Sequence, residues 1–478
     1  MSGRRTGGWP ACRCCARFRL AVALAAALLL AGAAAPAGAV SIHTIFTHSE
    51  LDWQTLHTEH FAVHYDRALE EPARYAAAVA ELAYTRIAAD LNCNLAEEYD
   101  IILRDSDDYA NGLTDPSDGA ITIWLTPMDF NLRGNHRWLQ NVIYHELAHM
   151  LHMRTAGTDL IESRVLVGPL LTMPNAMCPV WFTEGLAQYK AERGTEEFDS
   201  FRAMLLRTAV LDDALLPYAK MSVFGKNSFE YERAYSQGYA LVRYLAAAYG
   251  DTALVRIVRA KGESFTDFDQ ALLDNIGLDG EQLYDSWVAT LRTQTPAWSA
   301  RAPLGEVQLT VDAGWSDQNP VVSADGRWLA YASNNQHDYQ RLQVWRRDLR
   351  DPRAPDRLLA DNVNPGLGIS ADGARVFYTK AEEDRRGSNF NDLFVWDDGA
   401  TRRVTTGARV FYPAPCPDGR RVAAIQQQAG RAALVLIELD GGMVTQLYRG
   451  VLEEQLFAPR VSPDGNRWTL SARREDGA

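Results

Sequence analysis

Four copies of one short pattern recur at a nearly constant interval in the C-terminal part of the chain. Each copy ends in Asp-Gly, and the aspartates are Asp325, Asp372, Asp418 and Asp464, at intervals of 47, 46 and 46 residues. Each Asp-Gly precedes a short run of alternating apolar residues, and glycine accepts the positive φ that a hairpin turn needs. Strand pairs that repeat every ~40–50 residues are typical of the blades of a β-propeller.

A β-sandwich with unrelated turns is the alternative, but it gives no reason for an interval that stays constant over several repeats. The last copy reads Ala-Pro-Arg-Val-Ser-Pro-Asp-Gly. This phrase resembles the blades of TolB-like periplasmic propellers, and the resemblance covers residues 313–478. It implies six or more blades in a closed ring, whereas four are present. We therefore expect either a fragment of a longer protein or a ring that is open.

The first 39 residues have the composition of an export signal. Five arginines, the last of them Arg19, precede an uncharged apolar run from Leu20 to Ala35, and Ala37-Gly38-Ala39 supplies the small residues that signal peptidase requires. A membrane anchor is the alternative, but sixteen residues are fewer than the ~20 that span a bilayer as a helix. We predict a signal peptide at 1–39 and an exported protein, periplasmic or secreted, with no membrane span after signal removal.

The rest of the chain is acidic and poor in cysteine. Removal of the signal takes the formal net charge from −13 to −18, which argues against a nucleic-acid partner. Cys93, Cys178 and Cys416 remain, and the first two are the only pair within one expected domain. One disulfide is possible there, but three cysteines do not make a disulfide scaffold, so the core must stabilise the fold.

Residues 40–298 combine a few strands with many helices, which predicts an α+β domain. Apolar and β-branched runs predict strands at 60–65, 99–103 and 120–125. We expect the last of these to be a sheet edge to which an extended peptide adds. Helical periodicity predicts helices at 70–91, 138–154, 183–193, 201–211, 234–249, 252–261 and 283–293. A linker at 299–312 and the propeller repeats at 313–478 follow.

The strongest chemical signal in this domain is the sequence His145-Glu146-Leu-Ala-His149. Two histidines four positions apart on a helix differ by about 40° around its axis, so both imidazoles can reach one metal ion. Neutral imidazole suits zinc, and Glu146 lies where it can accept a proton from a water on that metal. A surface helix with two unrelated histidines is the alternative, but the flanking residues are largely apolar, and a buried glutamate needs a partner.

A third ligand must come from elsewhere in the chain. Histidine at position 155 with glycine at 152 would give the metzincin arrangement, but the chain has Thr155 and His152. Because His152 lies about 10 Å along the helix axis from His145, we interpret it as a supporting or structural residue. The better candidate is Glu184 in Trp-Phe-Thr-Glu-Gly, where Thr183 is expected to cap a helix and the aromatic residues favour an inward side chain.

Together these motifs resemble the gluzincin metallopeptidases, particularly bacterial peptidase MA-like proteins. The resemblance spans about residues 58–295 and includes Ala-Asn-Gly at 110–112 and Ala-Tyr-Ser-Gln-Gly-Tyr at 234–239. It implies a zinc ion held by His145, His149 and Glu184, with Glu146 as general base and acid. In the related aminopeptidases a Tyr-x-x-Gly segment donates a phenol to the oxyanion, which suggests that role for Tyr235. A core tyrosine is the alternative at this position.

The chain departs from the resemblance at two points. The Gly-x-Met-Glu-Asn signature that anchors a substrate's free amine in those aminopeptidases is absent, which favours an endopeptidase. Thermolysin-type enzymes place an aspartate four residues after the ligand glutamate to hold a zinc histidine. Here that residue is Gln188, whose amide oxygen can accept the same hydrogen bond.

The sequence therefore predicts an exported zinc metallopeptidase that cleaves peptide or protein substrates, with the propeller contacting substrate or a protein partner. A prolyl oligopeptidase-like serine enzyme is the first rival, but its Gly-x-Ser-x-Gly elbow is missing. A structural zinc is disfavoured because such sites generally have four protein ligands. A non-catalytic periplasmic binding or scaffold protein is the remaining alternative. It would use the propeller for protein interaction, with an inert zincin-like domain, and would bind without cleaving.

Overall fold

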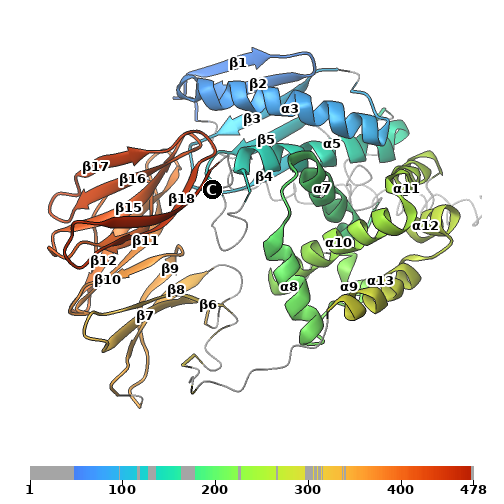
Figure 1. Ribbon diagram of the computed structural model, residues 1–478. Helices are drawn as coiled ribbons and strands as arrows, with labels where there is room; N and C mark the ends of the chain where they lie inside the picture. Colours follow the sequence, from blue (N-terminus) through green and yellow to red (C-terminus); the bar gives the residue numbers. More distant parts are fainter. Residues whose placement is uncertain are drawn as a thin grey trace, which may run out of the picture. The chain divides into compact units, whose positions relative to one another are not determined.

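The first part of the chain folds into a five-stranded mixed sheet with two long helices on one face (Figure 1). The strands follow the order β1-β2-β3-β5-β4. Their bounds are Trp53–His57 (β1), Phe61–Asp66 (β2), Tyr99–Arg104 (β3), Gly112–Asp115 (β4) and Ala120–Trp124 (β5). β2, β3 and β5 run parallel, whereas β1 and β4 are antiparallel to their neighbours. The predicted strands at 60–65, 99–103 and 120–125 are confirmed.

The prediction that residues 120–125 form the sheet edge is wrong. β4 lies outside β5 and pairs with it through the register Gly112↔Ile123 to Asp115↔Ala120. β4 has four residues, and Leu113 is the only apolar one, so it has no hydrophobic pattern from which a strand is predicted. It is this short strand that forms the edge beside the helices.

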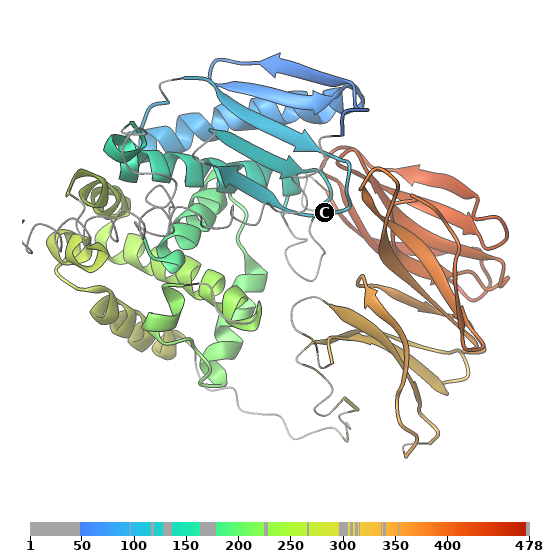
Figure 2. The same ribbon diagram turned by 180° about the vertical axis from the view of Figure 1, so that it is seen from behind.

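Helices α3 (Glu70–Leu91) and α5 (Trp138–Glu162) pack against the same face of the sheet, and the strands lie in front of them in Figure 2. α3 has the bounds that the sequence predicts. Ala73, Ala76, Ala80 and Ala83 on one side of this helix are fully buried, so the helix lies close to the sheet. Asn92 ends it in the left-handed conformation with φ of 47°.

The computed structural model describes residues 48–95, 97–115, 119–127, 136–162, 178–223, 228–264, 267–295, 305, 309–310, 314, 316–335, 337, 341–351 and 353–474. The predicted signal peptide and most of the predicted linker lie outside these residues. The described residues from Leu51 onward belong to one compact unit. Within the described residues, no helix has both the length and the apolar character needed to cross a bilayer.

The second part of the chain is helical, as predicted, and has its own core. Its helices are α7 (Val180–Thr195), α8 (Ser200–Leu211), α9 (Tyr218–Met221), α10 (Ser228–Tyr249), α11 (Asp251–Ser264), α12 (Phe268–Ile276) and α13 (Gly280–Gln294). The prediction that Thr183 caps α7 is wrong. Pro179 occupies the cap position, and Trp181 and Phe182 already lie in the first turn, where both are fully buried. The helix begins before Thr183 because its first turn places the rings of Trp181 and Phe182 in the core.

Cys93, Cys178 and Cys416 are all free thiols, so the possible Cys93–Cys178 disulfide does not form. Cys93 packs against the core of the sheet, whereas Cys178 belongs to the core of the helical part.

The repeats form a series of antiparallel sheets. The first holds β6 (Asp317–Val322), β7 (Trp328–Ser333), β8 (Leu342–Asp348) and β9 (Arg357–Val363). The second holds β10 (Leu367–Ile369), β11 (Arg375–Glu383), β12 (Asn389–Asp397) and β13 (Ala400–Arg403). The third holds β14 (Val410–Pro415), β15 (Arg421–Gln428), β16 (Arg431–Glu438) and β17 (Val444–Arg449), and β18 (Gln455–Val461) pairs with β19 (Trp468–Arg473). The sheets resemble propeller blades, but the described residues form no closed propeller.

Each predicted Asp-Gly turn joins the first two strands of its sheet. The four glycines have φ between 67° and 74°, which confirms the turns. In the first turn Asp325 accepts hydrogen bonds from the Ser323 hydroxyl at 2.6 Å and from the Arg327 amide at 3.0 Å. Ser370 and Asp372 repeat the first of these contacts at 2.6 Å, so the Ser-x-Asp-Gly phrase encodes the turn itself.

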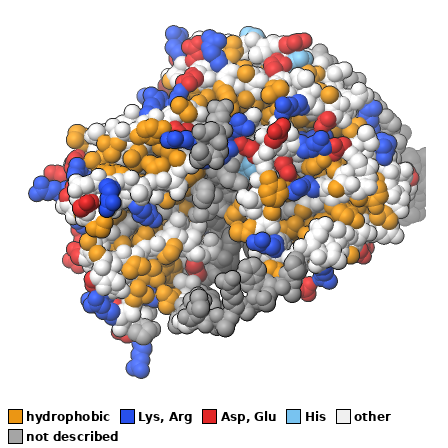
Figure 3. Space-filling view, viewed as in Figure 1, with side chains coloured by type: hydrophobic (Ala, Val, Ile, Leu, Met, Phe, Trp, Pro, Cys, Tyr) orange, Lys and Arg blue, Asp and Glu red, His pale blue; other side chains and the backbone are white. Residues whose placement is uncertain are grey.

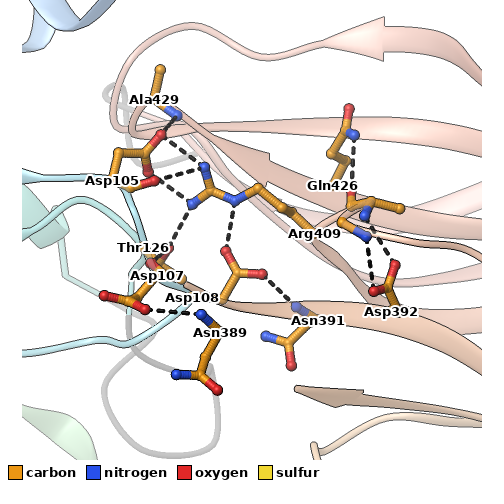
Figure 4. A network of polar contacts seen from close by, with 12 residues as sticks. Asp105, Asp107, Asp108, Thr126, Asn389, Asn391, Asp392, Arg409, Gln426 and Ala429 are labelled. Atoms are coloured by element: carbon orange, nitrogen blue, oxygen red, sulfur yellow. Dashed lines mark hydrogen bonds and ion pairs between the residues drawn. The ribbon is translucent and has the colours of Figure 1, made fainter. Parts of the chain in front are cut away.

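A buried arginine of the repeats binds the turn that follows β3 (Figure 4). Arg409 donates to Asp105 at 2.8 Å and to Asp108 at 2.7 Å and is only 7% exposed. The backbone amide of Asn391 donates to Asp108 at 2.8 Å, and that of Asn389 donates to Asp107 at 2.9 Å. These bonds hold the turn that leads into β4.

The start of α5 has a second such contact. Glu453 accepts hydrogen bonds from the Leu139 amide at 3.0 and 3.1 Å, so a carboxylate from the repeats caps this helix. Acidic and basic side chains are interspersed among apolar ones on the face drawn in Figure 3.

Candidate metal centre

Three side chains from two helices meet in one place. His145 and His149 lie one turn apart on α5, and Glu184 lies on α7. The two Nε2 atoms are 3.1 Å apart, and Glu184 Oε2 lies 3.5 Å from that of His145 and 3.3 Å from that of His149. The structure therefore brings the three predicted ligands together.

The spacing of these atoms fits a tetrahedral zinc ion. Nitrogen and oxygen ligands at about 2.0–2.1 Å from zinc occupy corners that are about 3.3–3.4 Å apart. The three observed separations, 3.1 to 3.5 Å, bracket that value. Among the described residues no fourth His, Cys, Asp or Glu joins the group, and a catalytic zinc site has three protein ligands and one open position.

Burial and mutual attraction set the charges of the three groups. Burial lowers the pKa of His145, and Glu184 offsets this only in part. Burial also acts to lower the pKa of His149 and is the largest single influence, but Glu184 and Glu146 together outweigh it and raise that pKa. Burial acts to raise the pKa of Glu184, yet the histidines, His149 foremost, hold it well below its usual range. Glu184 is therefore ionised at neutral pH, as a metal ligand must be.

Close packing of two helices fixes the position of Glu184. A Cβ at Gly185 would lie 2.4 Å from the carbonyl oxygen of Gly238 on α10, and a Cβ at Gly238 would lie 2.4 Å from the carbonyl oxygen of Trp181. Only glycine permits this approach. The Glu184 side chain is 12% exposed, as expected from its aromatic neighbours.

Glu146 contacts the edge strand of the sheet. It is 6% exposed, and its carboxylate Oε2 accepts a hydrogen bond from Thr114 Oγ1 at 2.7 Å. A Cβ at Gly112 would lie 2.6 Å from Glu146 Oε1, so the strand touches the carboxylate directly. No pattern in the sequence indicates a role for Thr114. The nearest signal was the Ala-Asn-Gly segment that ends at Gly112.

Tyr235 lies on α10, three residues before the glycine at which α10 touches α7. Its hydroxyl is 3.3 Å from that of Tyr231, and the guanidinium of Arg202 lies 5.4 Å from its ring centroid. The predicted role of Tyr235 as an oxyanion donor stays a prediction.

The two residues considered as supports of the site are both buried. His152 packs its ring edge against Phe182 with centroids 5.8 Å apart, and burial lowers its pKa to about 3. It is outside the three-residue group, as expected. Gln188 is 1% exposed, and neither of its amide atoms has a hydrogen-bond partner among the described residues. The hydrogen bond anticipated from a zinc histidine to Gln188 is therefore not formed in the described part of the chain.

Residues 106–293 match the family model described as the Peptidase MA superfamily. The chain thus contains a Peptidase MA superfamily domain that includes all five predicted site residues. Members of this superfamily are generally metal-dependent. No curated protein matches the sequence.

Several solved structures resemble part of the chain. A TolB-like structure from Agrobacterium tumefaciens shares 20% identity over 34% of this chain and 60% of its own, with a TM-score of 0.26. The tricorn protease shares 13% identity over 33% of this chain and 20% of its own, with a TM-score of 0.26. The β-propeller domain of the Trilobed protease from Pyrococcus furiosus shares 13% identity over 30% and 45%, with a TM-score of 0.23. The chain spans 60% or less of each of these structures.

Proposed function

We propose that this chain, which contains a Peptidase MA superfamily domain, is an exported zinc-dependent peptidase that hydrolyses peptide bonds in peptide or protein substrates. The observation that carries the proposal is the spacing of His145, His149 and Glu184, which fits a zinc ion with one open position. The missing Gly-x-Met-Glu-Asn segment favours cleavage within a chain over removal of N-terminal residues. The repeat sheets would contact the substrate or a protein partner.

The chemistry follows from the side chains around that position. A zinc ion held there would polarise the scissile carbonyl and lower the pKa of a water in the open position to about 7. Glu146 would accept a proton from the attacking water and then deliver it to the leaving amine. Tyr235 donates its phenol proton towards the carbonyl oxygen as negative charge develops, a contribution of about 10²–10³ in rate.

Strand β4 is the place for an extended substrate. It is the edge strand of the sheet, and Gly112 and Thr114 bring it against Glu146. A peptide that adds to this edge by backbone hydrogen bonds would run past the general base.

The test uses the full chain, zinc and a quenched fluorescent peptide library. We expect one equivalent of zinc and cleavage by the native chain. Glu146→Gln should keep the zinc and lower kcat by about 10²–10⁴, because the amide cannot accept the proton. Glu70→Gln, at an exposed glutamate paired with Arg74, is the matched control and should be fully active. Zinc binding without cleavage by the native chain would favour the scaffold alternative, and full turnover by Glu146→Gln would refute the assigned base.

A further inference from the structure

Thr114 is the residue through which the edge strand holds the candidate general base. We propose that it is a positioning residue for Glu146: its hydroxyl fixes one carboxylate oxygen and leaves the other to receive the proton. This inference rests on the proposed function, because it assigns Thr114 to the same reaction.

In the part of the chain that the structure describes, the Thr114 hydroxyl has two acceptors within reach, both on Glu146. Its Oγ1 is 2.7 Å from the carboxylate Oε2 and 2.9 Å from the backbone carbonyl oxygen. A hydroxyl has a single proton, and a carboxylate forms the shorter and stronger hydrogen bond. The carbonyl also lies inside α5, where the helical hydrogen-bond pattern already supplies it with a donor. The Thr114 hydroxyl therefore donates its hydrogen bond to Oε2 of Glu146.

Gly112 defines the environment of the other oxygen. Residues two apart on a strand share a face, so Gly112 and Thr114 both face α5. A Cβ at Gly112 would lie 2.6 Å from Glu146 Oε1 and 2.5 Å from Val142 Cγ2, so glycine is required here by close approach. Glu146 Oε2 is therefore hydrogen-bonded to Thr114, whereas Oε1 lies against Gly112, which has no side chain.

This arrangement orders the carboxylate before substrate arrives. A glutamate side chain has three rotatable torsions, and a general base must lie within hydrogen-bond reach of the proton it removes. Thr114 restricts those torsions with a hydroxyl on a stiff, β-branched side chain that also favours the strand. A purely structural Thr114 would only join β4 to α5, and its loss would reduce stability without a specific effect on kcat.

The test compares Thr114→Val with Thr114→Ser in the zinc-loaded full chain. Valine keeps the shape and removes the hydroxyl, so we expect kcat on the quenched peptide library to fall about 10- to 100-fold. KM and zinc stoichiometry should not change. Serine should restore kcat to within a few-fold of the native value. Thr122→Val on β5 is the matched control, because Thr122 pairs with Leu113 and so lies on the opposite face from Thr114.

Native kcat in Thr114→Val, an equal loss in Thr114→Ser, or loss of zinc would each overturn the inference. A readout other than activity separates it from the proposed function. In crystals of the zinc-loaded native chain we expect one Glu146 conformer bonded to Thr114, and several in Thr114→Val. If the native chain cleaves nothing yet shows this ordering, the proposed function has failed and the positioning of Glu146 by Thr114 stands. A single Glu146 conformer in both chains overturns the positioning role.

Discussion

Replacing Gly185 with alanine is expected to push α7 away from α10 and to displace Glu184. The new Cβ would lie 2.4 Å from the carbonyl oxygen and 2.5 Å from the carbonyl carbon of Gly238, and 2.9 Å from Val242 Cγ2. The first two atoms belong to the backbone of a long helix and cannot rotate away. Ordinary contact begins near 3.4 Å, so the helices must separate by about 1 Å.

The expected change in the free energy of unfolding of Gly185→Ala follows from two opposing effects. Overpacking of this kind costs about 1–3 kcal/mol, and a backbone contact belongs at the upper end. Alanine recovers about 1 kcal/mol because glycine is a poor helix former. We therefore expect the free energy of unfolding to fall by about 2 kcal/mol. Glu184 directly precedes Gly185, so a shift of this size should also weaken zinc binding by about 10- to 100-fold.

The assay pairs urea denaturation with competition between the protein and a fluorescent zinc chelator. Gly238→Ala should reproduce both effects, because its Cβ would lie 2.4 Å from the carbonyl oxygen of Trp181. Ala247→Gly, at an exposed position of α10, measures the helix-propensity effect alone and should leave zinc affinity unchanged. Native stability and native zinc affinity in Gly185→Ala would refute the idea that this close contact sets the position of Glu184.

Three further outcomes are expected. Burial raises the pKa of Glu453 to about 7. The folded chain therefore binds the carboxyl proton of Glu453 more tightly than the unfolded chain does. As pH rises from about 4.5 to 7, the free energy of unfolding should fall by up to about 3 kcal/mol. Glu453→Gln should remove that slope in urea denaturation, and an unchanged slope contradicts the assignment. Arg409→Met leaves the buried Asp108 carboxylate without its cation, so the free energy of unfolding should fall by about 3–5 kcal/mol in urea denaturation. An unchanged urea midpoint would refute a structural role for the Arg409–Asp108 pair. Cys93 and Cys178 are free, so dithiothreitol should not alter the urea midpoint, and a reductant-sensitive midpoint would contradict this.

The sequence predicts well those features whose physical cause lies within one segment. α3 has its predicted bounds because its apolar face is long and continuous. The repeated Asp-Gly turns appear in each sheet because glycine and a nearby serine or backbone amide determine them locally. The inward position of Glu184 follows from the neighbouring Trp181 and Phe182, which must be buried.

Other features depend on contacts between segments far apart in the chain. Thr114 touches Glu146 across 32 positions of sequence, and no local pattern distinguishes it from an ordinary strand threonine. The edge strand was missed because its one apolar residue gives no alternation. The polar Thr183 predicts a later start for α7 than the structure has, because the helix already includes the buried rings of Trp181 and Phe182. Arg409 lies 304 positions from Asp105, and nothing near it in sequence indicates this partner.

The most direct test of the central claim is zinc K-edge X-ray absorption on the full chain, with Glu184→Ala measured beside it. We predict one zinc ion with two imidazole nitrogens and a carboxylate oxygen at about 2.0–2.2 Å, and loss of the carboxylate contribution in the variant. A chain that binds no zinc, or a coordination sphere that Glu184→Ala leaves unchanged, would contradict the metal site on which the proposed peptidase depends.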